Sequence, residues 1–142
     1  VELLFNEFIR FRGADFTLGG ISEVKEIPVK CCVKQEVFGD YAIRTYISME
    51  KDVAIAFASR YVKDTFNDYD EYVQASLEDF LNLQNGLFIV NVSNDSSTEL
   101  TIDAPEHISG DTFSFENKAY YFPFMFPFGT VNIYIEAVKI DE

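Results

Sequence analysis

The stretch Tyr72–Gly86, YVQASLEDFLNLQNG, decides the fold because its side chains divide into two faces at helical spacing. At about 100° per residue, apolar residues and one glutamine gather on one side: Val73, Leu77, Phe80, Leu81 and Gln84. The opposite side carries Ala75, Asp79 and Asn82. Because side chains three positions apart are neighbours on a helix surface, Asp79 and Asn82 lie together. The pattern therefore predicts a helix that buries one face and presents a carboxylate and an amide outward.

The segments before this stretch predict two more helices and a hairpin. Val1–Phe11 has the spacing of an amphipathic helix. Ile27–Glu36 and Tyr41–Ile47 are rich in β-branched residues and predict two antiparallel strands that turn at Gly39–Asp40. Helical spacing returns in Ser48–Thr65, where Ser48 is the predicted N-cap. The acidic run Asn67–Glu71 then separates this helix from the one at Tyr72–Gly86 and is predicted to cap the second helix.

The segments after Gly86 predict strands. Leu87–Val92 is a nearly continuous apolar run, which is typical of a central strand covered on both sides. Glu99–Asp103 predicts a returning strand, and Thr112–Phe122 predicts a hairpin that turns at Asn117. The last strand, Thr130–Lys139, alternates between apolar and polar residues.

This order of elements predicts an α+β fold, with helices packed on one antiparallel sheet. A loose two-half repeat, a helix followed by strands, is also visible. The chain has 142 residues, of which 48% are hydrophobic and 16% aromatic, as expected for one globular domain over residues 1–142.

The charge of the chain excludes some partners. Its formal net charge is −13, which repels phosphate backbones and anionic lipid surfaces. We therefore expect no binding to nucleic acid or membranes, whereas a basic protein surface is attracted.

The cysteines favour a reducing compartment. The only two in the sequence, Cys31 and Cys32, are adjacent, and neighbouring strand residues point to opposite faces, so we expect no disulfide between them. Adjacent positions also predict one buried and one half-exposed thiol. Without an apolar run of about 18 residues or a signal peptide, the protein is expected to be cytoplasmic. A start at Val1 rather than methionine leaves room for a longer protein.

The outward face of the Tyr72–Gly86 helix carries a family resemblance. Asp79-x-x-Asn82 followed by Gly86 resembles the E-x-x-N…G signature of the CheC/CheX family of chemotaxis phosphatases. The resemblance extends to the loop Ala104–Gly110 and to Phe128–Gly129 before the last strand, so it covers nearly the whole chain. It implies a CheX-like α+β domain.

The chain departs from the family pattern at three points. Asp79 stands where the family usually has glutamate, and Ala75 stands where an acid or serine is common. CheC carries a second copy of the motif on its first long helix. The corresponding predicted helix here has Leu3-Leu4-Phe5-Asn6 and lacks the acid. One motif per chain is therefore expected, as in CheX.

The resemblance implies hydrolysis of the aspartyl phosphate on a CheY-like response-regulator receiver. The receiver would supply Mg²⁺, and this chain would bind no cofactor or metal itself. Asn82 would orient the attacking water, because an amide both donates and accepts hydrogen bonds. Asp79 would contact the receiver's lysine, and Ala75 would leave room for the receiver's loop. CheX forms homodimers, so the resemblance implies a homodimer here.

Other interpretations of these residues stay open. Glu78 lies four positions before Asn82 and is a second candidate for the acid that binds the receiver. Exposed Asp and Asn side chains are usually only solvated. The alternative function is a catalytically inactive receiver-binding or dimerisation module in two-component signalling. His107, the only histidine, has no second ligand near it in sequence and is interpreted as a loop residue.

Overall fold

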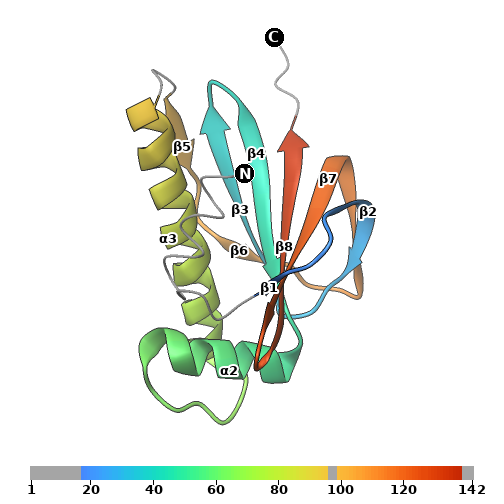
Figure 1. Ribbon diagram of the computed structural model, residues 1–142, viewed down its shortest axis with the longest axis vertical. Coiled ribbons are helices and arrows are strands. Elements are labelled where there is room, and N and C mark those ends of the chain that lie inside the picture. The colour runs from blue at the N-terminus through green and yellow to red at the C-terminus, as the bar shows by residue number, and fades with distance from the viewer. Residues whose placement is uncertain (1–16, 96–98, 139–142) are drawn as a thin grey trace.

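The computed structural model of the protein describes residues 17–95 and 99–138 (Figure 1). Within these residues, one antiparallel sheet of eight strands packs with two helices, which confirms the predicted α+β class. The elements are β1 Thr17–Leu18, β2 Ser22–Pro28, β3 Val33–Gly39, β4 Ala42–Ser48, α2 Lys51–Val62, α3 Glu71–Asp95, β5 Leu100–Ile102, β6 Glu106–His107, β7 Thr112–Phe126 and β8 Gly129–Val138. The strand order is β1-β7-β8-β4-β3-β5, with β2 also paired to β7 and β6 to β3.

Both helices pack on one face of the sheet. In Figure 1, α3 stands alongside the strands β3 and β5, and α2 crosses the end of the sheet near the turn between β7 and β8. The buried face of α3 is the predicted one, since Val73, Leu77, Phe80 and Leu81 all join the main hydrophobic core. Burial of this apolar stripe is what holds α3 on the sheet.

The other face of the sheet has a smaller core. Ile27, Cys32, Tyr46 and Tyr134 are buried there, and the first half of β7 contributes aromatic rings above them. The Phe113 ring lies 5.4 Å from that of Tyr46, centroid to centroid. The sheet is thus covered by helices on one side and by its own curled edge, β2 and β7, on the other.

The strand predicted at Leu87–Val92 is wrong, because α3 continues through Gly86 to Asp95. Phe88 lies seven positions after Leu81 and is buried in the same core, so the apolar face of the helix simply extends. A glycine inside a helix costs only about 1 kcal/mol relative to alanine, which is too little to end a helix that keeps burying apolar surface. The start of α3 follows the prediction, since the Asp70 carboxylate accepts hydrogen bonds from the backbone N–H groups of Tyr72 and Val73.

The single strand predicted at Ile27–Glu36 is two strands. β2 ends at Pro28, which has no N–H group to continue a ladder, and β3 begins at Val33. Between them Cys31 has a left-handed backbone conformation with φ 44°. Cys31 is half-buried and Cys32 is buried, and both are free, as predicted.

The hairpin predicted about Asn117 is also wrong, because β7 runs through this residue as one long strand. The pairing with β2 is irregular here: Val24 lies opposite Ala119 and Glu26 lies opposite Ser114. The backbone N–H and the side-chain amide of Asn117 both donate to a Glu136 carboxylate oxygen on β8. The turn-forming residue is therefore tied to the neighbouring strand instead of reversing the chain.

The helix predicted over Ser48–Thr65 is shorter. α2 begins at Lys51 after Glu50, and Ser48 ends β4, where its hydroxyl donates to the carbonyl oxygen of Lys30. Lys63, with φ 56°, adopts the left-handed conformation that ends the helix.

Three other predicted strands correspond to β4, β5 and β8 within one or two residues at each end. The helix predicted at Val1–Phe11 lies outside the described residues, so the two-half repeat stays a prediction. No helix in the described part of the chain combines the length and hydropathy needed to span a bilayer.

Candidate functional site

The predicted site residues line one groove. It runs between α3 and the chain that follows β5, with a volume of about 450 Å³. Its lining residues are Ala75, Glu78, Asp79, Asn82, Ala104 and Pro105. The side chains of Ala75, Asp79 and Asn82 are exposed, and that of Glu78 is half-buried. The structure therefore brings the four predicted residues together on one open wall of the helix.

The amide of Asn82 is exposed at one end and held from the sheet at the other. Nε2 of Gln35, on β3, donates a hydrogen bond of 2.7 Å to Oδ1 of Asn82. The sequence places Asn82 on the face opposite the core, whereas the structure places it at the rim of the helix–sheet interface. Among residues 17–95 and 99–138, no hydrogen bond engages Nδ2 of Asn82. The amide therefore keeps both N–H donors and one acceptor lone pair for a ligand.

Asp79 is held from the other side of α3. Its Oδ2 accepts a hydrogen bond of 2.6 Å from the hydroxyl of Tyr61, which comes from α2. Burial raises the pKa of Tyr61, and the neighbouring carboxylate of Asp79 raises it further, so the phenol stays a donor at neutral pH. Asp79 is exposed, and within the described residues no hydrogen bond or ion pair engages its second oxygen, which is therefore available to a cationic partner.

Glu78 contacts His107, the only histidine of the chain. Its Oε1 lies 2.8 Å from Nε2 of His107. His107 belongs to β6 rather than to a loop, and β6 pairs with β3. This contact ties α3 to the sheet edge one turn before Asn82. The described residues contain no group of three or more His, Cys, Asp or Glu side chains arranged for a metal ion.

A second groove adjoins the first along α3. It lies between α2 and α3, has a volume of about 650 Å³ and is lined by Tyr61, Val62, Asp64, Phe66, Tyr72, Ala75, Ser76 and Asp79. Ala75 and Asp79 line both grooves, so they form the ridge that separates them. Val62 and Tyr72 are exposed apolar side chains on its rim. A partner that covers the ridge would contact an amide on one side and aromatic surface on the other.

Sequence reasoning missed Gln35 and Tyr61, the two side chains that hold the motif. Tyr61 lies at the apolar spacing of α2, which predicts a core residue and not a donor to Asp79. Gln35 lies within a predicted strand, and nothing local marks it, because its contact with Asn82 spans 47 residues. Only a three-dimensional arrangement identifies such a partner.

The sequence matches no protein-family model, and no curated protein sequence matches it significantly. Solved structures do match its fold. A CheC-like superfamily protein from Shewanella sp. PV-4 superposes with a TM-score of 0.78 at 16% identity, over 97% of this chain and 94% of that chain. The chemotaxis protein CheX from Desulfovibrio desulfuricans gives 0.78 at 15% identity, over 96% and 95%. The CheX of a CheX–CheY–BeF₃–Mg²⁺ complex from Borrelia burgdorferi gives 0.72 at 16% identity, over 96% and 94%.

Each of these matches covers at least 96% of this chain and at least 94% of the other, so the likeness extends over nearly the whole chain. It agrees with the resemblance found in the sequence, which rests on the motif of α3 and the order of loops around it. The chain has the fold of the CheX and CheC-like chemotaxis proteins.

Proposed function

We propose that the protein accelerates hydrolysis of the aspartyl phosphate on a CheY-like response-regulator receiver. Asn82 orients the attacking water, and Asp79 contacts the receiver. The observation that carries this proposal is the exposed, anchored amide of Asn82 beside the carboxylate of Asp79 in one open groove. The fold adds support, because a CheX with this fold from Borrelia burgdorferi was solved in complex with CheY, BeF₃ and Mg²⁺.

The main requirement that the reaction places on this chain is to position one water molecule. Water attacks phosphorus, the bond from phosphorus to the aspartyl oxygen breaks, and inorganic phosphate leaves a free carboxylate behind. The receiver supplies Mg²⁺ and its own lysine to balance the charge on the phosphoryl oxygens. Placing one water in line with phosphorus lowers the entropic part of the barrier. A neutral amide suits this task, because it binds water without adding negative charge beside the phosphoryl group.

Asp79 serves recognition in this proposal. Its carboxylate is exposed on the ridge and attracts a lysine of the receiver, while the hydrogen bond from Tyr61 limits its rotation. An aspartate is one methylene shorter than the glutamate of the family motif, so the receiver must approach α3 more closely. The small side chain of Ala75, one turn earlier, permits that approach. Glu78 lines the same groove and is already in contact with His107.

A receiver-binding or dimerisation module without turnover is the second candidate. Two features of Asp79 favour it. Aspartate is shorter than the glutamate of the family motif, and the Asp79 carboxylate already accepts a hydrogen bond from Tyr61. Such a module would retain a BeF₃-activated receiver in a pull-down assay without releasing phosphate from a phosphorylated one. The homodimer implied by the family resemblance is tested separately, by light scattering of the purified protein.

The test follows phosphate release from a CheY-like receiver phosphorylated with acetyl phosphate, in the presence of Mg²⁺. We expect the protein to accelerate release, and Asn82→Ala to lose most of that acceleration. Leu83→Ala is the matched control, since Leu83 is the next exposed residue on α3 and lines neither groove. Release that is equally fast with and without the protein, across the receivers of the same genome, would eliminate the phosphatase function.

A further inference from the structure

We propose that Gln35 is a positioning residue that fixes which end of the Asn82 amide faces the partner. The consequence for catalysis rests on the proposed function, whereas the orientation itself rests on the hydrogen-bond network alone. An unrestrained asparagine presents its oxygen and its nitrogen almost equally, because the two ends have the same shape. The network around Gln35 removes that ambiguity.

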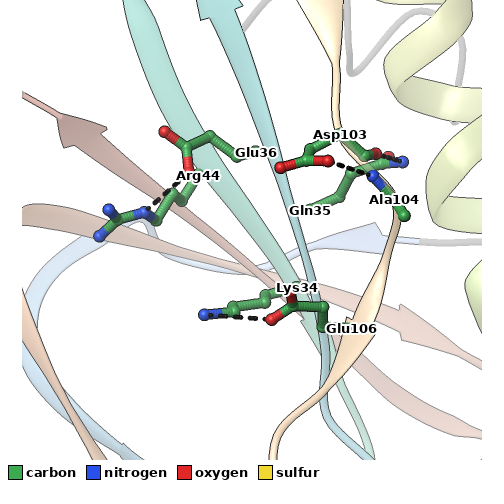
Figure 2. Close-up of a pocket in the computed structure, with 7 residues that line it drawn as sticks. All are labelled: Lys34, Gln35, Glu36, Arg44, Asp103, Ala104 and Glu106. Atoms are coloured by element: carbon green, nitrogen blue, oxygen red, sulfur yellow. Dashed lines mark hydrogen bonds and ion pairs between the residues drawn. The ribbon is translucent and has the colours of Figure 1, made fainter.

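Two backbone carbonyl groups determine the direction of every hydrogen bond in this network. Nε2 of Gln35 lies 2.8 Å from the carbonyl oxygen of Asp103, which only accepts hydrogen bonds. The end of Gln35 that faces Asp103 must therefore be its NH₂ group. The same nitrogen faces Asn82, so the end of Asn82 that points to Gln35 must be its oxygen. Figure 2 shows Gln35 beside Asp103 and Ala104, while its neighbours Lys34 and Glu36 pair with Glu106 and Arg44.

The other end of Gln35 is fixed in the same way. Thr45, on β4, donates its hydroxyl hydrogen to the backbone carbonyl of Gln35, so its oxygen is left to accept. Nδ2 of Asn85 donates to that hydroxyl oxygen at 2.8 Å and to Oε1 of Gln35 at 2.7 Å. Both hydrogens of the Asn85 amide are thus used, and Oε1 of Gln35 must face Asn85. The two carbonyl groups impose one consistent orientation on all three amides.

The network is buried, and one of its polar atoms has no hydrogen-bond partner. Gln35, Thr45 and Asn85 are each at most 1% exposed. Within the described residues, Oδ1 of Asn85 is buried without a hydrogen-bond partner. An unpaired buried carbonyl oxygen is unfavourable, and it offsets part of what the two hydrogen bonds from Nδ2 of Asn85 contribute to stability. The NH₂ group of Asn85 accounts for a polar residue at this buried position, because it orients Gln35.

The result is a fixed pattern of donors at the mouth of the groove. Nδ2 of Asn82 points away from the sheet with two N–H donors, and Oδ1 retains one lone pair for a water hydrogen. This arrangement donates to phosphoryl or water oxygen atoms and accepts from one water molecule. A flipped amide would point its oxygen at the phosphoryl group and lose the donors. Gln35 therefore preorganises Asn82 for one polarity of ligand.

The test compares Gln35→Met, which has a similar length and no hydrogen-bonding groups, with Gln35→Glu, which accepts hydrogen bonds but donates none. We expect Gln35→Met to lower kcat for receiver dephosphorylation by about 10- to 100-fold with little change in KM, because misplacing a group that positions the attacking water slows the chemical step by about this much. The side-chain amide order parameter of Asn82, measured by NMR, should fall below about 0.6. Gln35→Glu should lower kcat while the amide stays ordered, with its hydrogens exchanging more slowly because they turn toward the introduced carboxylate.

Glu36→Gln is the control, since this neighbour on β3 points to the other face and pairs with Arg44. It should leave both kcat and the Asn82 order parameter unchanged. A Gln35→Met protein that keeps an ordered Asn82 amide overturns the positioning role. So does a mobile Asn82 amide in the unaltered protein, which needs no variant to fold. If the unaltered protein has no phosphatase activity, the proposed function fails, and the NMR measurements still decide the role of Gln35.

Discussion

The two sides of α3 hold their functional side chains in different ways. On the side that faces the sheet, Asn82 is anchored by Gln35, which is itself fixed by Thr45 and Asn85 in a buried network. On the side that faces α2, Asp79 is anchored by one half-buried phenol, that of Tyr61. Each of the two side chains accepts one hydrogen bond, but the donor to Asn82 belongs to a buried network, whereas the donor to Asp79 is a half-buried phenol.

The physical basis of this contrast is burial. A hydrogen bond in the protein interior cannot be replaced by water, so its loss leaves unpaired groups at high cost. A hydrogen bond to an exposed carboxylate is readily replaced by water, so its geometry adapts to a partner at low cost. Changes on the sheet side should therefore alter turnover and stability, and changes on the α2 side should alter binding.

The largest effect is expected for Asn82→Asp. This change keeps the oxygen that accepts from Gln35 and replaces the outward NH₂ group with a charged oxygen. Because that oxygen would face the phosphoryl group, kcat should fall by about 100-fold or more. An exposed helix position should keep the free energy of unfolding within about 0.5 kcal/mol. Phosphate release and denaturant unfolding measure the two quantities, and near-normal turnover would contradict the orientation of the amide.

The second prediction compares stability on the two sides. Thr45→Val removes the hydroxyl that joins Gln35 and Asn85 and leaves a buried N–H group unpaired, so it should lower the free energy of unfolding by about 1–3 kcal/mol. Tyr61→Phe removes a hydrogen bond to an exposed carboxylate and should lower it by less than about 1 kcal/mol. Urea unfolding checks both variants. Equal losses of unfolding free energy in the two variants would contradict the stronger anchoring on the sheet side.

The third prediction concerns binding on the α2 side. Asp79→Ala removes the carboxylate offered to the receiver's lysine and should raise KM for the receiver about fivefold, the value of an exposed ion pair near 1 kcal/mol. The effect should shrink at high salt, because the pair is screened. Glu71→Ala is the control for net charge, since it removes an exposed acid at the start of α3 outside both grooves. An effect on kcat alone would assign Asp79 to the chemical step.

The smallest effect is expected in the titration of Tyr61. Burial and the Asp79 carboxylate both raise its pKa above 10.0. Asp79→Asn should lower the pKa of Tyr61, which should still remain above 10.0 because burial is the larger cause. The raised pKa favours the neutral phenol in the folded protein, so its contribution to stability is complete below pH 10.0 and is lost as the pH rises further. NMR of ¹³C-labelled tyrosine measures the titration, and an unchanged pKa would show that the hydrogen bond to Asp79 is absent in solution.

Much of the fold follows from local pattern. The buried face of α3, its cap at Asp70, the strand β4 and the α+β class all rest on spacings within a few residues. The errors arise where a distant contact outweighs a local signal. Gly86 and the apolar run after it predict a break and a strand, but Phe88 buries in the core shared with Phe80 and keeps the helix going. Asn117 predicts a turn, but its contacts with Glu136 keep β7 in the sheet.

The candidate site shows the same division. The spacing of Asp79 and Asn82 determines that they share one face of a helix, because side chains three positions apart are always neighbours there. The composition likewise determines an acidic surface, which is independent of how the chain folds. Which atom of Asn82 faces outward, and that Tyr61 donates to Asp79, follow only from the tertiary structure. The physical reason is that a hydrogen bond is short and directional, so it exists only once folding has brought β3 and α2 against α3.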